Sequence, residues 1–320
     1  MSAGQFPGPI YRDTRDLTPF GGGRVRTPVR EIAEGMGGLI HGVLGGGDSR
    51  ISVDGSVPRL KLLPGKAART VYDAIFSSTD PNRLIAAGRA YPGWAGLCCV
   101  MAGLLAYKQG GYLRAAELLQ RGLSIRNDDE ANQFAASYLT RVVTRVEVAE
   151  RIVVPVLFSE ESVFLALSHS LRETGQTEAA FETLVRLPPS LPTALARCAL
   201  AAALGRDQEV VVWTEGLLNA DDLSAALLLV RARSLRRLGA YSQAQQALKE
   251  VLRRQKTSMS LRNDALTDRA LMLLDNGRKS LNPRDWQRGK QGELETFEVI
   301  RKDIEARRAW EQKWKQFGGD

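Results

Sequence analysis

The sequence predicts an all-α fold, an α-solenoid of antiparallel helix pairs with one small β-hairpin insertion and a C-terminal capping helix. A glycine interrupts the helical pattern five times, and a small residue precedes each of these glycines by seven positions. Glycine ends helices readily, and small side chains let paired helices approach closely, so the pattern indicates a helix–turn–helix repeat. The turn glycines are Gly110, Gly175, Gly205, Gly239 and Gly277, and the small residues are Gly103, Ser168, Cys198, Ala232 and Ala270. Five positions after the glycines stand Ala115, Ala180, Val210, Ala244 and, after the fifth, Asn282.

The composition is typical of a soluble protein with a substantial core. The chain has 320 residues, of which 44% are hydrophobic and 25% charged. Its start lacks a basic stretch followed by an apolar run, and no uncharged stretch is long enough to cross a membrane. The three cysteines, Cys98, Cys99 and Cys198, form no disulfide framework and are expected to be buried free thiols. We therefore expect a cytoplasmic protein.

Charge is distributed unevenly along the chain. The net charge is +8, whereas residues 231–320 alone carry +9, with 21 Lys and Arg against 12 Asp and Glu. An anionic partner would be attracted to this end first.

Residues 1–66 differ from the rest because they are rich in glycine and proline. Such a segment offsets its ordering entropy poorly, so we expect most of it to be flexible. Within it, apolar residues at helical spacing predict one helix that forms on docking. These residues are Val29, Ile32, Met36, Leu39 and Val43.

The helical repeat domain is predicted over residues 67–290. Its expected helices cover 67–77, 81–89, 94–109, 112–126, 128–143, 159–173, 177–185, 192–204, 207–218, 223–238, 241–254, 260–276 and 283–288. Between them, residues 144–158 are rich in β-branched side chains, and Pro155 opposes a helix. Here Val146 and Val148 alternate with charged neighbours, which predicts a two-stranded hairpin (144–149 and 152–158) that turns near Glu150 and covers one side of the solenoid.

The last segment, 291–320, is predicted to be an amphipathic helix. Its apolar face contains Phe297, Ile300, Ile304, Trp310, Trp314 and Phe317. A solenoid needs a terminal cap for its last repeat, and the first half of this face suits that role. Because Trp310, Trp314 and Phe317 extend beyond what a cap needs, they are candidates for self-association.

Three runs carry a family resemblance: Leu105–Leu119, Leu171–Phe181 and Leu235–Leu248 resemble tetratricopeptide repeats. The resemblance covers about residues 94–290 and implies that the first helix of each pair lines a concave groove. It places in that groove Leu104, Tyr107, His169, Arg172, Ala199, Ala202, Arg233, Arg236, Leu271 and Leu274. Three arginines and a histidine beside an apolar floor suit a partner segment with acidic side chains or a free carboxylate.

Catalytic and cofactor motifs are not found in the sequence. The two histidines, His41 and His169, lie far apart and belong to no triad-like motif, and no His, Cys and carboxylate cluster has metal-ligand spacing. The Gly-Lys at Gly65 and Lys66 lacks the upstream glycine and the following hydroxyl of a phosphate loop. We expect no enzymatic activity and no cofactor or metal.

Three functions are compatible with these patterns. The first is a non-catalytic scaffold or adaptor that binds a protein segment in the groove. The second is nucleic-acid binding through the basic C-terminal quarter, with Arg253, Arg254, Arg284 and Arg288 on phosphates and Trp286 stacking on a base. The third is self-association through Trp310, Trp314 and Phe317. The 29–44 segment could instead fold into its own groove or a neighbour's.

Overall fold

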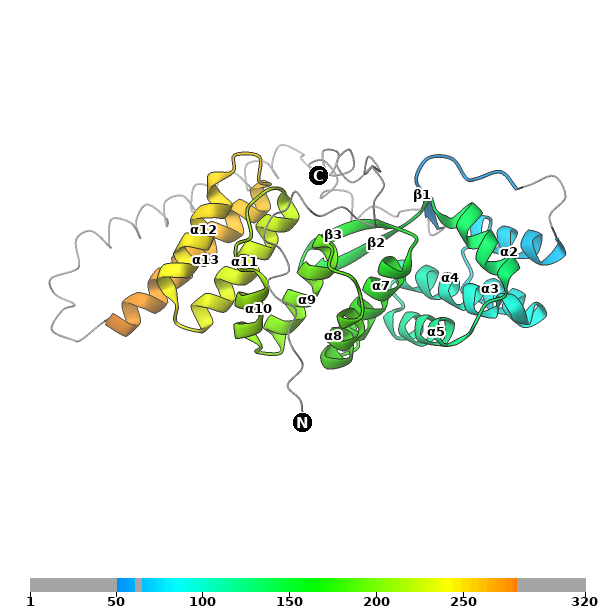
Figure 1. Cartoon of the computed structure of the whole chain (residues 1–320), viewed down its shortest axis with the longest axis horizontal. Coiled ribbons are helices and arrows are strands. Elements are labelled where there is room, and N and C mark those ends of the chain that lie inside the picture. Colours follow the sequence, from blue (N-terminus) through cyan, green and yellow to red (C-terminus); the bar gives the residue numbers. More distant parts are fainter. Residues whose placement is uncertain (1–50, 61–64, 281–320) are drawn as a thin grey trace, which may run out of the picture. The chain divides into compact units, whose positions relative to one another are not determined.

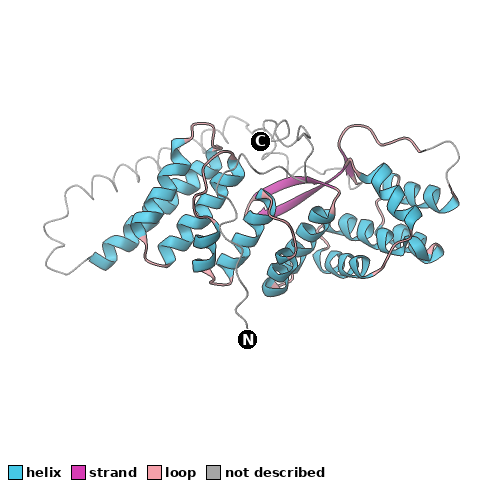
Figure 2. Ribbon diagram, in the orientation of Figure 1, coloured by secondary structure: helices cyan, strands magenta, loops and turns pink. Residues whose placement is uncertain are grey.

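The protein is mostly helical and carries one small sheet, as Figure 2 shows for the computed structural model. The structure describes residues 51–60 and 65–280. The chain divides into two compact units, Met1–Asp268 and Arg269–Asp320. The elements, most of them labelled in Figure 1, are β1 (Ser52–Val53), α2 (Lys66–Phe76), α3 (Pro81–Ala90), a 3₁₀ turn (Pro92–Trp94), α4 (Ala95–Lys108), α5 (Tyr112–Ser124), α6 (Asp129–Phe134), a π turn (Ala135–Leu139), β2 (Val142–Ala149), β3 (Ile152–Leu157), α7 (Glu160–Glu173), α8 (Thr177–Val185), α9 (Leu191–Ala203), α10 (Asp207–Trp213), α11 (Asp222–Arg237), α12 (Tyr241–Arg253) and α13 (Met259–Ser280).

Four of the five predicted turns share one backbone geometry. Gly110, Gly175, Gly205 and Gly239 all have φ between 74° and 82°. In each turn the glycine N–H donates to the carbonyl three residues before it, and the next N–H donates to the carbonyl five residues before its own position, at 2.8–3.3 Å. These paired bonds satisfy carbonyls left open at the end of the first helix. The predicted turns at these four glycines are confirmed.

The small residues around these turns lie where the helices of a pair meet. The positions seven before and five after each of the four glycines are all buried. At the closest approach, a Cβ added to Gly103 would lie 2.7 Å from the side chain of Leu119 on the partner helix. The predicted close packing within the pairs α4–α5, α7–α8, α9–α10 and α11–α12 is therefore confirmed.

The fifth predicted turn is wrong, because α13 continues through Gly277 to Ser280. A glycine inside a helix costs only about 1 kcal/mol relative to alanine. At the other turns a buried alanine or valine anchors the returning helix, whereas this position holds the polar Asn282. Without an apolar anchor, continuing the helix is the cheaper outcome.

Two other helices end earlier than predicted. The helix predicted to reach residue 143 gives way to a π turn and then to β2, because Val142, Val143 and Thr144 favour a strand. The helix predicted over 207–218 ends at Trp213. There the Thr214 hydroxyl bonds back to the Val210 carbonyl at 2.6 Å, and Gly216 has φ 72°.

The predicted hairpin is present as β2 and β3, but the sheet has a third strand. Ser52 and Val53 of β1 pair antiparallel with Val143 and Val142. The prediction of two strands is corrected, since a two-residue strand is too short to show a period-two pattern. The tight turn between β2 and β3 places Arg151 at φ 62°, and its N–H donates to Glu147 Oε1 at 3.2 Å.

Pro155 stands opposite Arg145 in the β2–β3 ladder. Phe158 N–H donates to the Val142 carbonyl, so residues 144 and 156 form a hydrogen-bonded pair and residues 145 and 155 do not. The N–H that proline lacks would therefore point away from β2, toward the outer edge of β3. Pro155 thus leaves the ladder intact.

One face of the hairpin is part of the core. Alternate residues of both strands are buried, and β2 packs against α7, α9 and α4 (Figure 1). The buried hairpin side chains are Val142, Thr144, Val146, Val148, Ala149, Val154 and Val156. The prediction that the hairpin covers one side of the helical array is in line with this packing.

Three predicted segments lie outside the described residues. They are the helix over residues 29–43, the helix over 283–288 and the C-terminal helix over 291–320. Of the helices in the described ranges, none combines the length and the apolar character that a membrane span requires.

Candidate partner-binding surface

The first predicted groove positions do not line an open groove. Leu104, Tyr107 and His169 are only 4–6% exposed, because the hairpin lies over the helix face to which they belong. The resemblance to a plain helical repeat placed these side chains at the surface. The correction follows from the insertion, whose β2 strand packs against α4 and α7.

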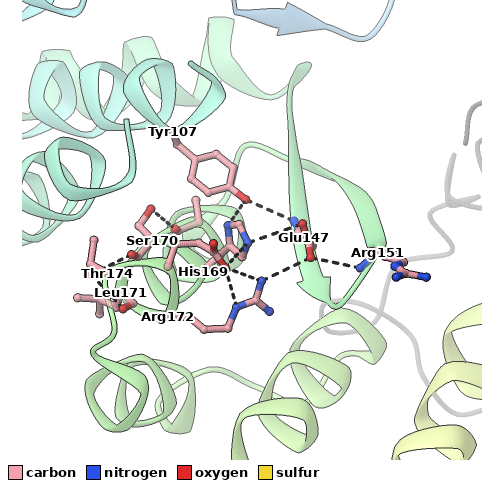
Figure 3. A network of polar contacts seen from close by, with 10 residues as sticks. Tyr107, Glu147, Arg151, His169, Ser170, Leu171, Arg172 and Thr174 are labelled. Atoms are coloured by element: carbon pink, nitrogen blue, oxygen red, sulfur yellow. Dashed lines mark hydrogen bonds and ion pairs between the residues drawn. The ribbon is translucent and has the colours of Figure 1, made fainter. Parts of the chain in front are cut away.

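A polar cluster joins the hairpin to two helices (Figure 3). The Tyr107 hydroxyl lies 2.9 Å from His169 Nδ1 and accepts the N–H of Glu147 at 3.3 Å. Because the hydroxyl accepts from the backbone, its own proton is free to be donated to Nδ1, which leaves the proton of a neutral imidazole on Nε2. One phenol therefore bridges α4, α7 and β2.

Two carboxylates and one arginine complete the cluster around His169. Nε2 of His169 lies 3.5 Å from Glu173 Oε1 and 3.9 Å from Glu147 Oε2, and it has no hydrogen-bond partner among the described residues. Arg172 Nη2 lies 3.5 Å from Glu147 Oε1 and 3.0 Å from Glu173 Oε1. The predicted groove arginine of α7 is thus already paired with a carboxylate from the hairpin and one from its own helix.

The electrostatics of the cluster keep His169 neutral near pH 7. Burial lowers the pKa of His169 and the Arg172 guanidinium lowers it further, while Glu147 and Glu173 oppose this shift only in part. Burial also raises the pKa of Tyr107, so the phenol keeps its proton. The cluster is therefore built around two neutral, hydrogen-bonded rings.

The groove positions predicted on α9 and α11 are more open. Ala199 and Ala202 are half-buried, and so are Arg233 and Arg236. Arg233 Nε donates to Asp268 Oδ2 at 2.6 Å, and the Asp268 side chain is only 10% exposed. The charge of Arg236 also acts on Asp268. In the second unit, Leu271 and Leu274 are exposed.

The ion pair between Arg233 and Asp268 does not fully offset the burial of the carboxylate. Burial raises the pKa of Asp268, and the charge and hydrogen bond of Arg233 act against that rise without cancelling it. At Asp207 the balance has the opposite result. Burial acts to raise its pKa, but hydrogen bonds from Arg237 and Ser234 outweigh burial, so the pKa is lowered.

Sequence reasoning did not find the acidic partners of these arginines. Glu147, Asp207 and Asp268 are separated from Arg172, Arg237 and Arg233 by 25 to 35 residues. No local spacing rule connects groups so far apart. The only available signal was that an arginine partly covered by neighbouring helices favours a nearby counter-charge.

The predicted anionic-partner patch is only partly described. Arg253 pairs with Glu250 at 2.7 Å and Arg254 with Asp222 at 3.3 Å, so neither is an unpaired cation. Arg284 and Arg288 of the same patch lie outside the described residues. The candidates for self-association also lie outside the described residues; they are Trp310, Trp314 and Phe317.

The cysteines are placed for packing and not for chemistry. All three are buried and free, and burial raises the pKa of the Cys98 and Cys198 thiols to about 12. A nucleophilic cysteine needs the opposite shift. Within residues 51–60 and 65–280, no three His, Cys, Asp or Glu side chains come together as metal ligands.

Comparison with protein-family models finds no match, and comparison with curated proteins finds no significant similarity.

Proposed function

We propose that this protein is a non-catalytic scaffold of tetratricopeptide-like helix pairs that binds a segment of a partner protein along α9 and α11. The observation that carries the proposal is the recurrence of one turn geometry at four glycines, with small buried residues at fixed distances on both sides. Repeated helix pairs of this kind present the first helix of successive pairs side by side, which forms an extended surface suited to a chain segment.

The chemistry of the described residues supports binding over catalysis. The one described histidine is buried and neutral, and the cysteine thiols are buried with raised pKa values. Neither is a candidate for proton transfer to, or attack on, a substrate. The hairpin contacts α4, α7 and α9, and the predicted groove positions that stay partly exposed are Ala199 and Ala202 on α9 and Arg233 and Arg236 on α11.

The partner segment is proposed to carry an acidic side chain beside small or apolar residues. Ala199 and Ala202 leave room for side chains from a partner, and Arg233 offers a guanidinium for a carboxylate. Arg233 already holds Asp268, so a ligand carboxylate binds by replacing it. The pKa of Asp268 is raised, so the displaced carboxyl can take up a proton, which limits the cost of leaving it buried without Arg233.

Two neighbouring alanines of α9 provide a matched test. Ala202 lies at a predicted groove position, whereas Ala203 is exposed on another face of the same helical turn. We expect Ala202→Glu to abolish recovery of the partner in a nuclease-treated pull-down from the native cells, and Ala203→Glu to leave it intact. Both substitutions place the same charge near the same helix end, so their effects on helix stability match.

The reverse pattern, or equal loss in both variants, would refute binding along α9. Equal melting temperatures for the two variants check that neither is merely unfolded. Recovery that disappears with nuclease treatment in the wild type would assign the interaction to nucleic acid.

A further inference from the structure

The last described helix, α13, is apolar on two sides. Leu261, Ala265 and Met272 form one buried face, which also carries Asp268, the partner of Arg233. A second apolar face lies on the far side and contains Met259, Leu266, Ala270, Leu273 and Leu274. On this side Met259, Leu266, Leu273 and Leu274 are 66%, 43%, 37% and 37% exposed. A surface helix in a soluble domain normally has one apolar face and one polar face.

The part of this second face that lies in the unit Arg269–Asp320 consists of Ala270, Leu273 and Leu274. At about 100° per residue, these three side chains lie roughly 100–200° around the helix from the buried Met272. A packing partner on that side would contact the small Ala270 with a leucine on either side of it around the helix. A small residue between two leucines allows a second helix to pack closely against α13.

We infer that residues 293–304 of the same chain form the helix that covers Ala270, Leu273 and Leu274. The chain continues from Ser280 for another 40 residues. The apolar residues of this stretch recur at the spacing of one helix face, which could pack against the apolar face of α13. Phe297, Ile300 and Ile304 are separated by three and four positions, so they form one side of a helix.

The length of the connection suits a return along α13. Leu273 lies about 10 Å from Ser280 along the helix, at 1.5 Å per residue. Residues 281–296 can span up to about 50 Å when extended, so the chain easily turns back. An antiparallel arrangement places Phe297 beside Leu273 and Ile300 beside Ala270.

Charge complementarity supports this occupant and its direction. From Arg269 onward α13 carries Arg269, Arg278 and Lys279 against Asp275, and the tail carries Glu293, Glu295 and Glu298 around Phe297. In the antiparallel arrangement the glutamates that precede Phe297 meet the basic end of α13. The orientation also places acidic residues at the start of the tail helix, where the helix dipole favours them.

A second copy of the chain is the competing occupant, and tethering decides against it. A segment attached by a short linker is present at an effective concentration in the millimolar range, far above that of a separate molecule. The inference is independent of partner binding along α9 and α11.

Disulfide trapping in the full-length chain tests the inference. The variant Ala270→Cys/Ile300→Cys is compared with Ala270→Cys/Lys302→Cys, because Ile300 is placed beside Ala270 and Lys302 falls on the opposite side of the tail helix from Ile300. The native cysteines are buried, so they compete little for oxidation. Under mild oxidation we expect the first pair to close within one chain at least about tenfold faster than the second, as seen on non-reducing gels and by mass spectrometry.

Two outcomes would overturn the inference. A disulfide-linked dimer that increases with protein concentration would assign the face to a second copy. Equal rates for the two pairs, or no intramolecular disulfide in either, would show that the tail does not pack there.

Limited trypsin digestion provides a second measurement on the intact chain. We expect Leu273→Glu/Leu274→Glu to accelerate cleavage after Arg301 and Lys302 by about tenfold, because the tail loses its apolar support. Leu271→Glu is the matched control, since Leu271 is exposed on a different face of α13. Equal acceleration in control and variant would contradict docking on Leu273 and Leu274.

Discussion

The Tyr107 hydroxyl lies 2.9 Å from Nδ1 of His169, and both side chains are buried under the hairpin. The same hydroxyl accepts the N–H of Glu147 in β2. A single oxygen thus satisfies a buried ring nitrogen on α7 and a part-buried N–H on the hairpin. Because the alternative for the ring nitrogen is burial without a partner, this oxygen contributes to holding the hairpin against the helices.

We expect Tyr107→Phe to lower the free energy of unfolding by about 1–3 kcal/mol, because it leaves the buried Nδ1 of His169 without its partner and removes the acceptor of the part-buried Glu147 N–H. Urea denaturation measures the change. Tyr112→Phe is the control, since Tyr112 contacts the same two rings but its hydroxyl makes no hydrogen bond in the described structure. A loss below about 0.5 kcal/mol in Tyr107→Phe would show that the bridge contributes nothing to stability.

Stability should fall as the pH drops through the titration of His169. Its pKa is lowered in the folded state, so the unfolded chain binds the proton more readily. The stabilisation is complete above about pH 6.5, the unfolded value, and is lost as the pH falls toward the folded value. Urea denaturation at pH 7.5 and 5.5 measures the slope. We expect His169→Asn, which keeps an acceptor for Tyr107, to have a flatter pH dependence, and an unchanged slope would assign the effect to other groups.

Removal of Arg233 should destabilise the protein more than removal of the whole ion pair. Arg233→Ala leaves Asp268 buried without its counter-charge, and we expect a loss of about 2 kcal/mol after allowing for the partial exposure of the arginine. The double variant Arg233→Ala/Asp268→Ala should recover at least half of that loss. Additive losses in the double-mutant cycle would mean that the two residues do not interact.

Gly103 should tolerate no larger side chain, for reasons of space. In Gly103→Ala the new methyl group would lie 2.7 Å from Leu119 and 3.1 Å from its backbone nitrogen. We expect a loss of about 1–3 kcal/mol from overpacking, measured as a shift in the urea midpoint. Adding Leu119→Ala should not rescue it fully, because the backbone contact persists. A neutral Gly103→Ala would show that α4 and α5 can separate freely.

Much of the fold could be predicted from local sequence because its determinants are local. The sequence contains a glycine with a small residue seven positions earlier at Gly110, Gly175, Gly205 and Gly239. In the structure these glycines have positive φ and the small residues are buried. Asn282 already marked the fifth unit as different, yet its effect on Gly277 depended on a balance of about 1 kcal/mol. Such a balance cannot be judged from a pattern alone.

The site was less predictable, since it depends on where the hairpin packs. The alternation around Val146 predicted a strand with one buried face, but no pattern in the strand names the helices it covers. Tyr107 and His169 therefore looked like groove residues when they are core residues. The pairing of Arg233 with Asp268 was invisible for the same reason, because 35 residues separate them.

The hairpin also has a consequence for how the protein folds and opens. Helix pairs in a row interact mainly with their neighbours, so such arrays can unfold one unit at a time from their ends. Here β2 contacts α4, α7 and α9, and Ser52 pairs with a residue 91 positions away. These long-range contacts form late, since closing large loops is entropically costly. Once formed, they couple the three helices, so amide protons in α4, α7 and α9 should exchange with solvent through one shared opening event.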